Sequence, residues 1–126
     1  MNTHAINWFE IPVSDFDRAK KFYQQIFDYE MPENTMDGAR MGFLLYDFQN
    51  GGRGGAIVHN PGFYTPSENG SLIYLNCEPD LSVVLGRVEN AGGAIVKPKS
   101  LVAENLGYWA LIKDSEGNRV ALHSMK

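Results

Sequence analysis

Glu10 and His123 are the titratable residues of this chain whose positions in the sequence could support chemistry. Glu10 lies in an alternating segment near the start and His123 in another near the end, so each is predicted to project from one face of a strand. A carboxylate beside an imidazole can fix the tautomer of the ring and form an acid–base pair. The same two residues could instead join two parts of the fold, orient a ligand or act as metal ligands.

The other reactive side chains favour structural roles. Cys77 is the single cysteine, cannot form an internal disulfide, and is interpreted as a small buried apolar residue. The segment Gly51–Gly55 lacks the Gly-Lys-Ser/Thr ending of a phosphate-binding loop and no helix follows it, so it is predicted to be a hairpin loop. Arg53 at the tip of that loop could still contact an acidic ligand or partner. The sequence contains no Cys-x-x-Cys pair and no Ser-His-Asp arrangement.

Length and composition describe one globular domain. The chain has 126 residues, 44% of them hydrophobic, and a net charge of −4. It is long enough to bury a core without disulfides. The absence of a basic cluster argues against nucleic acid as a partner, and no apolar run approaches the roughly 20 residues of a membrane helix. No secretory signal is recognised at the N-terminus, so a cytoplasmic location is expected.

The opening segment predicts a strand that runs directly into a helix. Phe9, Ile11 and Val13 alternate with Trp8, Glu10 and Pro12, which is the period of a strand with two different faces. The apolar residues then change to helical spacing, at Ala19, Phe22, Tyr23, Ile26 and Phe27. The change falls at Ser14-Asp15, where either side chain can accept the free N–H groups of the first helical turn.

The order of elements repeats along the chain. The first half, about 5–59, is predicted as a strand at 6–13, a helix at 15–28 and strands near 30–36, 39–48 and 54–59. A Pro-, Gly- and Asn-rich linker occupies about 60–70. The second half, about 71–126, is predicted as a strand at 71–77, a helix marked by Leu81–Val88 and ended by Gly92-Gly93 in left-handed conformation, and strands at 94–98, 108–114 and 119–124.

This order resembles the opening and closing of the vicinal oxygen chelate superfamily, which includes glyoxalases, bleomycin-resistance proteins and extradiol dioxygenases. The opening match is the strand, Asp15 and the helix containing Phe22-Tyr23. The closing match is the turn Asp114-x-x-Gly117-Asn118 before the last strand. The resemblance implies an α+β fold of two βαβββ modules, whose curved mixed sheets surround a shared cavity with a helix on each outer side. It also implies a two-fold homodimer.

Within that fold, alternation sorts the side chains of three strands between helix and cavity. Phe9, Ile11 and Val13, then Ile73, Leu75 and Cys77, then Val120 and Leu122, are predicted to face the helices. The cavity is predicted to receive Trp8, Glu10, Pro12, Leu72, Tyr74, Asn76, Arg119, Ala121 and His123.

The resemblance also locates four positions that hold a metal ion in metal-dependent members. Here these positions fall on Trp8, on Ala56 or Val58, on Leu72 and on Ala121, none of which is a metal ligand. Glu10 lies two residues beyond the first position and His123 two beyond the fourth, so both should project onto the surface of the missing ligands. No cofactor is predicted, and a divalent metal is disfavoured.

Two functions from different classes follow. In the first, the chain is a binding protein that holds a small, partly aromatic molecule against Trp8, Tyr74, Asn76 and Ala121. In the second, it is a lyase-like or dioxygenase-like enzyme with a partial or metal-free site centred on Glu10 and His123. The missing ligands favour the first.

Overall fold

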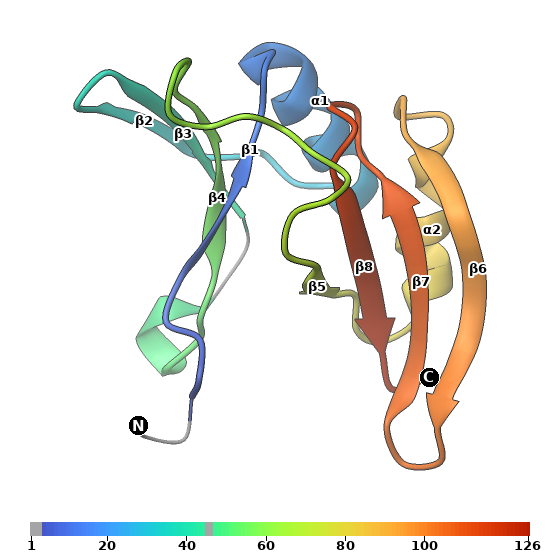
Figure 1. Cartoon of the computed structure of the whole chain (residues 1–126). Coiled ribbons are helices and arrows are strands. Elements are labelled where there is room, and N and C mark those ends of the chain that lie inside the picture. Colours follow the sequence, from blue (N-terminus) through green and yellow to red (C-terminus); the bar gives the residue numbers. More distant parts are fainter. Residues whose placement is uncertain (1–3, 45–46) are drawn as a thin grey trace.

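The computed structural model describes residues 4–44 and 47–126, and its elements confirm the repeated order (Figure 1). The first module contains β1 (Phe9–Pro12), α1 (Phe16–Phe27), β2 (Glu33–Met36), β3 (Ala39–Phe43), a short 3-10 turn (Phe48–Asn50) and β4 (Gly55–His59). The second contains β5 (Ile73–Asn76), α2 (Leu81–Val88), β6 (Ala94–Ala103), β7 (Gly107–Lys113) and β8 (Arg119–Ser124). The fold is therefore α+β, as predicted.

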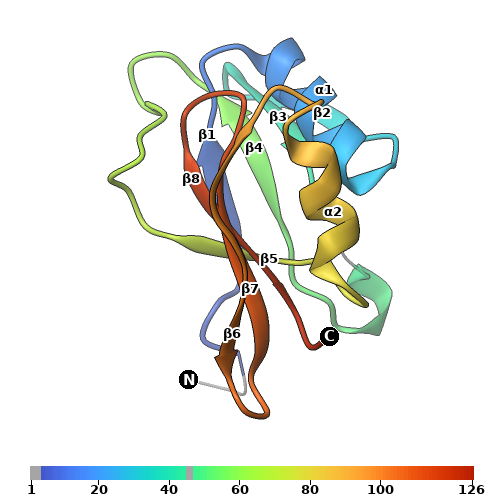
Figure 2. The same ribbon diagram turned by 90° about the vertical axis from the view of Figure 1, so that its right-hand side faces the viewer.

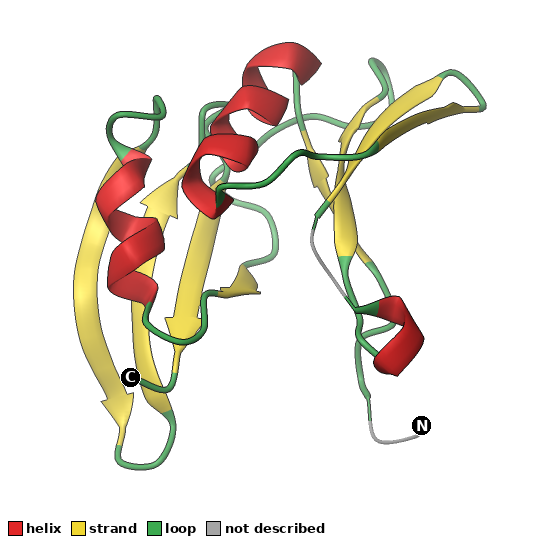
Figure 3. Ribbon diagram, turned by 180° about the vertical axis from the view of Figure 1, so that it is seen from behind, coloured by secondary structure: helices red, strands yellow, loops and turns green. Residues whose placement is uncertain are grey.

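Each module forms one four-stranded mixed sheet. The strand orders are β1-β4-β3-β2 and β5-β8-β7-β6, and in each sheet only the first pair is parallel. Helix α2 packs on β6, β7 and β8, whereas α1 packs on β4 and on α2. Figure 3 shows this arrangement from behind. Figure 2 shows both helices on one side of the molecule and the linker 60–70 on the other.

The main core lies between the helices and the sheets and is shared by both modules. It includes Ile11 and Phe22 from the first module and Leu75 and Leu122 from the second. Along β1, β5 and β8, the side chains predicted to face the helices therefore point into the core, because neighbouring residues of a strand point to opposite faces. Asp15 caps α1 as predicted, since its side chain accepts the Arg18 N–H at 3.1 Å.

Most element boundaries lie within three residues of the sequence prediction, and three differences are larger or of another kind. The predicted strand 39–48 ends at Phe43, and its residues 45 and 46 lie outside the described residues. Strand β6 continues past Pro98 to Ala103, because an edge strand tolerates a residue that has no backbone N–H. The pairing of β6 with β7 shifts in register between Lys97 and Ser100, around this proline.

The third difference is the end of α2, where the prediction of two left-handed glycines is half wrong. Gly92 has a positive φ of 104°. Gly93 does not, and it is required by space instead: a Cβ atom there would lie 2.6 Å from the Lys113 carbonyl oxygen. None of the helices in the described part of the chain has the length and apolarity to cross a membrane.

Candidate functional site

The first module presents a hydrogen-bonded carboxylate on the face of its sheet opposite α1. The Tyr64 hydroxyl donates a short hydrogen bond to Glu10 Oε1, and the Trp8 indole N–H donates to Oε2 at 3.4 Å. The hydrogen bond from Tyr64 to Glu10, together with burial, raises the pKa of Tyr64 above its ordinary value. The Trp8 ring also meets the Phe43 ring edge-on, with centroids 6.1 Å apart. A single carboxylate is thus held among three aromatic rings.

An apolar floor lies beside this carboxylate. Ala56 pairs with Glu10 on one side and with Phe43 on the other, so the three share a face. Met41 and Val58 extend it, and Tyr64 packs against the cluster. We call the face formed by Trp8, Glu10, Met41, Phe43, Ala56 and Val58 the first open face.

Of the metal positions implied by the family resemblance, the first, Trp8, and both candidates for the second, Ala56 and Val58, therefore lie on the same face as Glu10. Across the described residues, no group of three or more His, Cys, Asp and Glu side chains could hold a metal ion. That a divalent metal is disfavoured stays a prediction.

The second module presents a matching face opposite α2, which we call the second open face: Tyr74, Asn76, Trp109, Ala121 and His123. Cross-strand pairing places them together, since Tyr74 pairs with Ala121 and His123 pairs with both Asn76 and Trp109. The Tyr74 and Trp109 rings lie 6.2 Å apart, and Tyr74 is 53% exposed. Ala121 is fully buried, so its surroundings rather than its own surface would meet a ligand.

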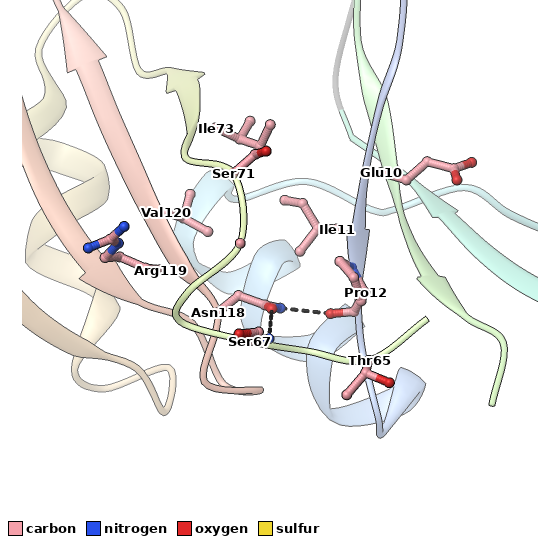
Figure 4. Close-up of a pocket in the computed structure, with 11 residues that line it drawn as sticks. Glu10, Ile11, Pro12, Thr65, Ser67, Ser71, Ile73, Asn118, Arg119 and Val120 are labelled. Atoms are coloured by element: carbon pink, nitrogen blue, oxygen red, sulfur yellow. Dashed lines mark hydrogen bonds between the residues drawn. The ribbon is translucent and has the colours of Figure 1, made fainter. Parts of the chain in front are cut away.

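Glu10 and His123 have different hydrogen-bond partners. Glu10 is bonded to Trp8 and Tyr64, whereas His123 Nε2 lies 2.7 Å from the Leu106 carbonyl oxygen. Figure 4 shows Glu10 pointing away from Ile73, across β1 from the second module. Their predicted role as an acid–base pair stays a prediction.

A pocket of about 260 Å³ lies between the two modules, where the linker passes over them. Ile11, Ile73 and Val120 form its apolar wall, and Ser67 and Ser71 are among the residues at its edge (Figure 4). Asn118 closes one end. Its amide donates to the Pro12 carbonyl at 2.7 Å, and its oxygen accepts the Ser67 N–H at 3.0 Å.

Asn118 belongs to a buried polar cluster that joins the modules at the Asp114–Asn118 turn. The Asp114 carboxylate accepts hydrogen bonds from the Tyr23 hydroxyl at 2.7 Å and from the Asn118 amide at 3.0 Å. It also accepts the backbone N–H groups of Glu116 and Asn118. Burial and the Asp114 charge raise the pKa of Tyr23 well above its ordinary value.

Tyr64 and Asp114 are the polar residues whose roles the sequence did not reveal. Tyr64 lies in the predicted linker, and no local pattern indicates that its hydroxyl reaches a carboxylate 54 residues away. Cys77, in contrast, behaves as predicted: it is buried, and desolvation raises the pKa of its thiol to about 12.

The chain belongs to the Glyoxalase/Bleomycin resistance protein/Dioxygenase superfamily, whose family profile matches residues 5–122. No curated protein matches the sequence. The hypothetical protein SA1046 from S. aureus is 20% identical, with a TM-score of 0.69 over 98% of this chain and 95% of that one. The glyoxylase/bleomycin resistance protein/dioxygenase domain from Frankia sp. EAN1pec is 16% identical, with a TM-score of 0.70 over 99% of this chain and 100% of that one.

The solved structure of glyoxalase I from Zea mays is also similar, at 18% identity and a TM-score of 0.67, over 93% of this chain and 43% of that one. At these identities the likeness concerns the fold. It confirms the two-module architecture and leaves the chemistry to the residues described above.

Proposed function

We propose that this protein binds a small, partly aromatic organic molecule on the first open face. Trp8 and Tyr64 would contact its ring, and Glu10 would accept a hydrogen bond from its polar group. The observation that carries the proposal is the half-buried Glu10 carboxylate, bonded by a phenol and an indole above an apolar floor. Ligand sites combine apolar walls with a few placed polar groups in this way.

We further propose that the protein acts as a homodimer. The second open face and the outer edge strand β6 expose large apolar side chains, including Tyr74, Val96 and Leu101, which are 53%, 50% and 58% exposed. Exposed apolar surface and unpaired sheet edges are usually covered by a partner. Light scattering at micromolar concentration should give the mass of two chains. A purely monomeric mass would contradict the proposal.

A screen of small aromatic and thiol-conjugated compounds by thermal shift tests the binding proposal. A ligand at 100 times its dissociation constant adds about 2.7 kcal/mol to the stability of the folded state. Binding should also quench Trp8 fluorescence, with Trp109→Phe as the background that isolates the signal. Trp8→Ala should abolish the thermal shift at little cost to the fold, because Trp8 is 37% exposed. If Trp8→Ala unfolds the protein, or binds the same compounds equally well, the proposal is wrong.

An enzyme centred on Glu10 and His123 is the second candidate. The bond between the Tyr64 hydroxyl and the Glu10 carboxylate favours it, since it places a proton donor on a potential base. This candidate requires a pH-dependent turnover of some screened compound that is lost in both Glu10→Ala and His123→Ala. Binding without turnover in the parent protein decides for the first function.

A further inference from the structure

A second pocket lies where the two modules meet, on the side of β1 away from Glu10. Its volume is about 160 Å³. Phe9, Phe27, Leu44, Arg53 and Gly54 line it from the first module, and Tyr74, Leu75 and Asn76 line it from the second. Phe9 and Glu10 are neighbours on a strand and point to opposite faces, so this pocket is separate from the proposed ligand site.

The lining of this pocket is largely apolar, and its polar members are Arg53, Asn76 and the Tyr74 hydroxyl. Phe9, Phe27 and Leu75 are wall residues, and Arg53 is the charged member of a lining that contains neither Asp nor Glu. The pocket is therefore electrostatically suited to an anion with an apolar body.

Arg53 retains the capacity to bind such an anion. Its Nη1 lies 3.3 and 3.4 Å from the Gly51 and Gly52 carbonyl oxygens, which are long hydrogen bonds from one nitrogen of a group with five N–H donors. None of the ion pairs formed among the described residues involves Arg53. The Asp47 carboxylate, at the start of the same loop, accepts hydrogen bonds from Asn50 instead.

We infer that this pocket binds a small monocarboxylate with a flat apolar body, such as an aromatic acid. Its carboxylate would pair with the Arg53 guanidinium, which matches both oxygens in a planar fork. Its ring would lie between Phe9, Phe27 and Leu75. The volume fits a single ring, because an apolar cavity of about 150 Å³ holds benzene.

Such a ligand would contact both modules and stabilise their packing. Calorimetric titration with benzoate and with its neutral isostere benzamide tests this inference. We expect a dissociation constant of about 1 mM for benzoate, as for other ligands of this size. Benzamide should bind about tenfold more weakly, because it lacks the charge-assisted bonds to Arg53.

Two arginine variants locate the anion. Arg53→Gln should weaken benzoate binding about tenfold and leave benzamide binding unchanged. Arg119→Gln removes the same charge from an exposed residue that lines the larger pocket between the modules, and it should change neither. Phe27→Trp, which places a larger side chain in the wall, should weaken the binding of both compounds.

The outcomes separate this inference from the proposed function. Trp8→Ala should retain benzoate binding while it loses the ligands of the first open face. If benzoate does not bind at about 10 mM, or binds equally to Arg53→Gln, the inference is wrong. Loss of binding in Arg119→Gln alone, or in Trp8→Ala alone, would place the anion in another site and overturn it as well.

Discussion

Two polar clusters flank β1, and they are built in opposite ways. At the end of the strand, the Pro12 carbonyl is bonded to Asn118 and through it to Asp114, which is 4% exposed and accepts four hydrogen bonds from both modules. In the middle of the strand, Glu10 is half-buried and is bonded to Trp8 and Tyr64. The Asp114 cluster is enclosed, whereas the Glu10 cluster opens to solvent.

The difference separates structural polar groups from groups available to a ligand. A buried carboxylate that accepts four hydrogen bonds, as Asp114 does, has no acceptor capacity left, and its removal leaves its donors unpaired. Glu10, in contrast, is bonded to an indole and a phenol, both of which carry a ring that a small molecule can contact. The Asp114 carboxylate joins the two modules, whereas the Glu10 carboxylate lies at the surface of the first module.

The Asp114 cluster should show the largest effect. Asp114→Ala leaves the Tyr23 hydroxyl and the Asn118 amide without their buried acceptor, and each unpaired group costs about 1–3 kcal/mol. We expect a total loss of about 3–5 kcal/mol in the free energy of unfolding, measured by urea denaturation. Glu104→Ala, at an exposed turn residue, should change it by less than about 0.5 kcal/mol. Similar values for the two variants would show that the Asp114 cluster does not hold the modules together.

The next largest effect should be a pH dependence of folding stability that arises from Glu116, in the same turn. Burial alone would raise the pKa of this carboxyl group, but hydrogen bonds from Arg18, Ser14, Ser115 and the Asp15 N–H hold it at about 2, below the ordinary value of 4.5. Because the folded-state pKa is lowered, the stabilisation is present above pH 4.5 and is lost as the pH falls toward 2.

The full shift corresponds to about 3 kcal/mol. We expect about half of that, since the Arg18 side chain is 55% exposed and its interaction is screened. Urea denaturation at pH 7 and pH 3 should therefore show a smaller acid-induced loss in Glu116→Gln than in the parent protein. An equal loss would mean that this contact between the modules is not coupled to protonation.

The sequence predicted those features of the fold that local rules determine. The cap at Asp15 follows from side-chain chemistry at a helix start, and the faces of Ile11 and Tyr74 follow from the two-residue period of a strand. The extension of β6 past Pro98 could not be predicted, because a strand tolerates proline according to its position in the sheet. That position is set by the whole module.

The candidate site was predictable only in part, for a related reason. Alternation and family resemblance placed Trp8 and Glu10 on one face. The contact of Tyr64 with Glu10 depends on how the linker crosses the sheet, and the bond of Tyr23 to Asp114 joins residues 91 positions apart. The sequence indicated that Tyr23 is on the apolar side of its helix. It held no local signal for the partner of its hydroxyl group.

Tyr64→Phe sharpens the comparison from the side of the Glu10 cluster. The variant keeps the ring against Met41, Ala56 and Val58 but removes the hydrogen bond to Glu10. At this half-buried position we expect a stability loss of at most about 1 kcal/mol. Affinity for a compound that requires Trp8 should nevertheless fall about fivefold to tenfold, measured by fluorescence quenching. A stability loss as large as that of Asp114→Ala would show that the Glu10 cluster is structural too.

Metal binding should show the smallest effect, because the side chains beside Glu10 supply no further ligands. The family resemblance places the ligand positions on Trp8, on Ala56 or Val58, on Leu72 and on Ala121, and a site of one or two protein ligands binds divalent ions weakly. After exposure to excess Zn²⁺, Ni²⁺, Mn²⁺ or Fe²⁺ and desalting, elemental analysis should find well under one equivalent retained. Glu10→Ala should retain the same small amount. One full equivalent that disappears in Glu10→Ala would show that the open carboxylate is a metal ligand, and that its indole and phenol partners support a metal centre.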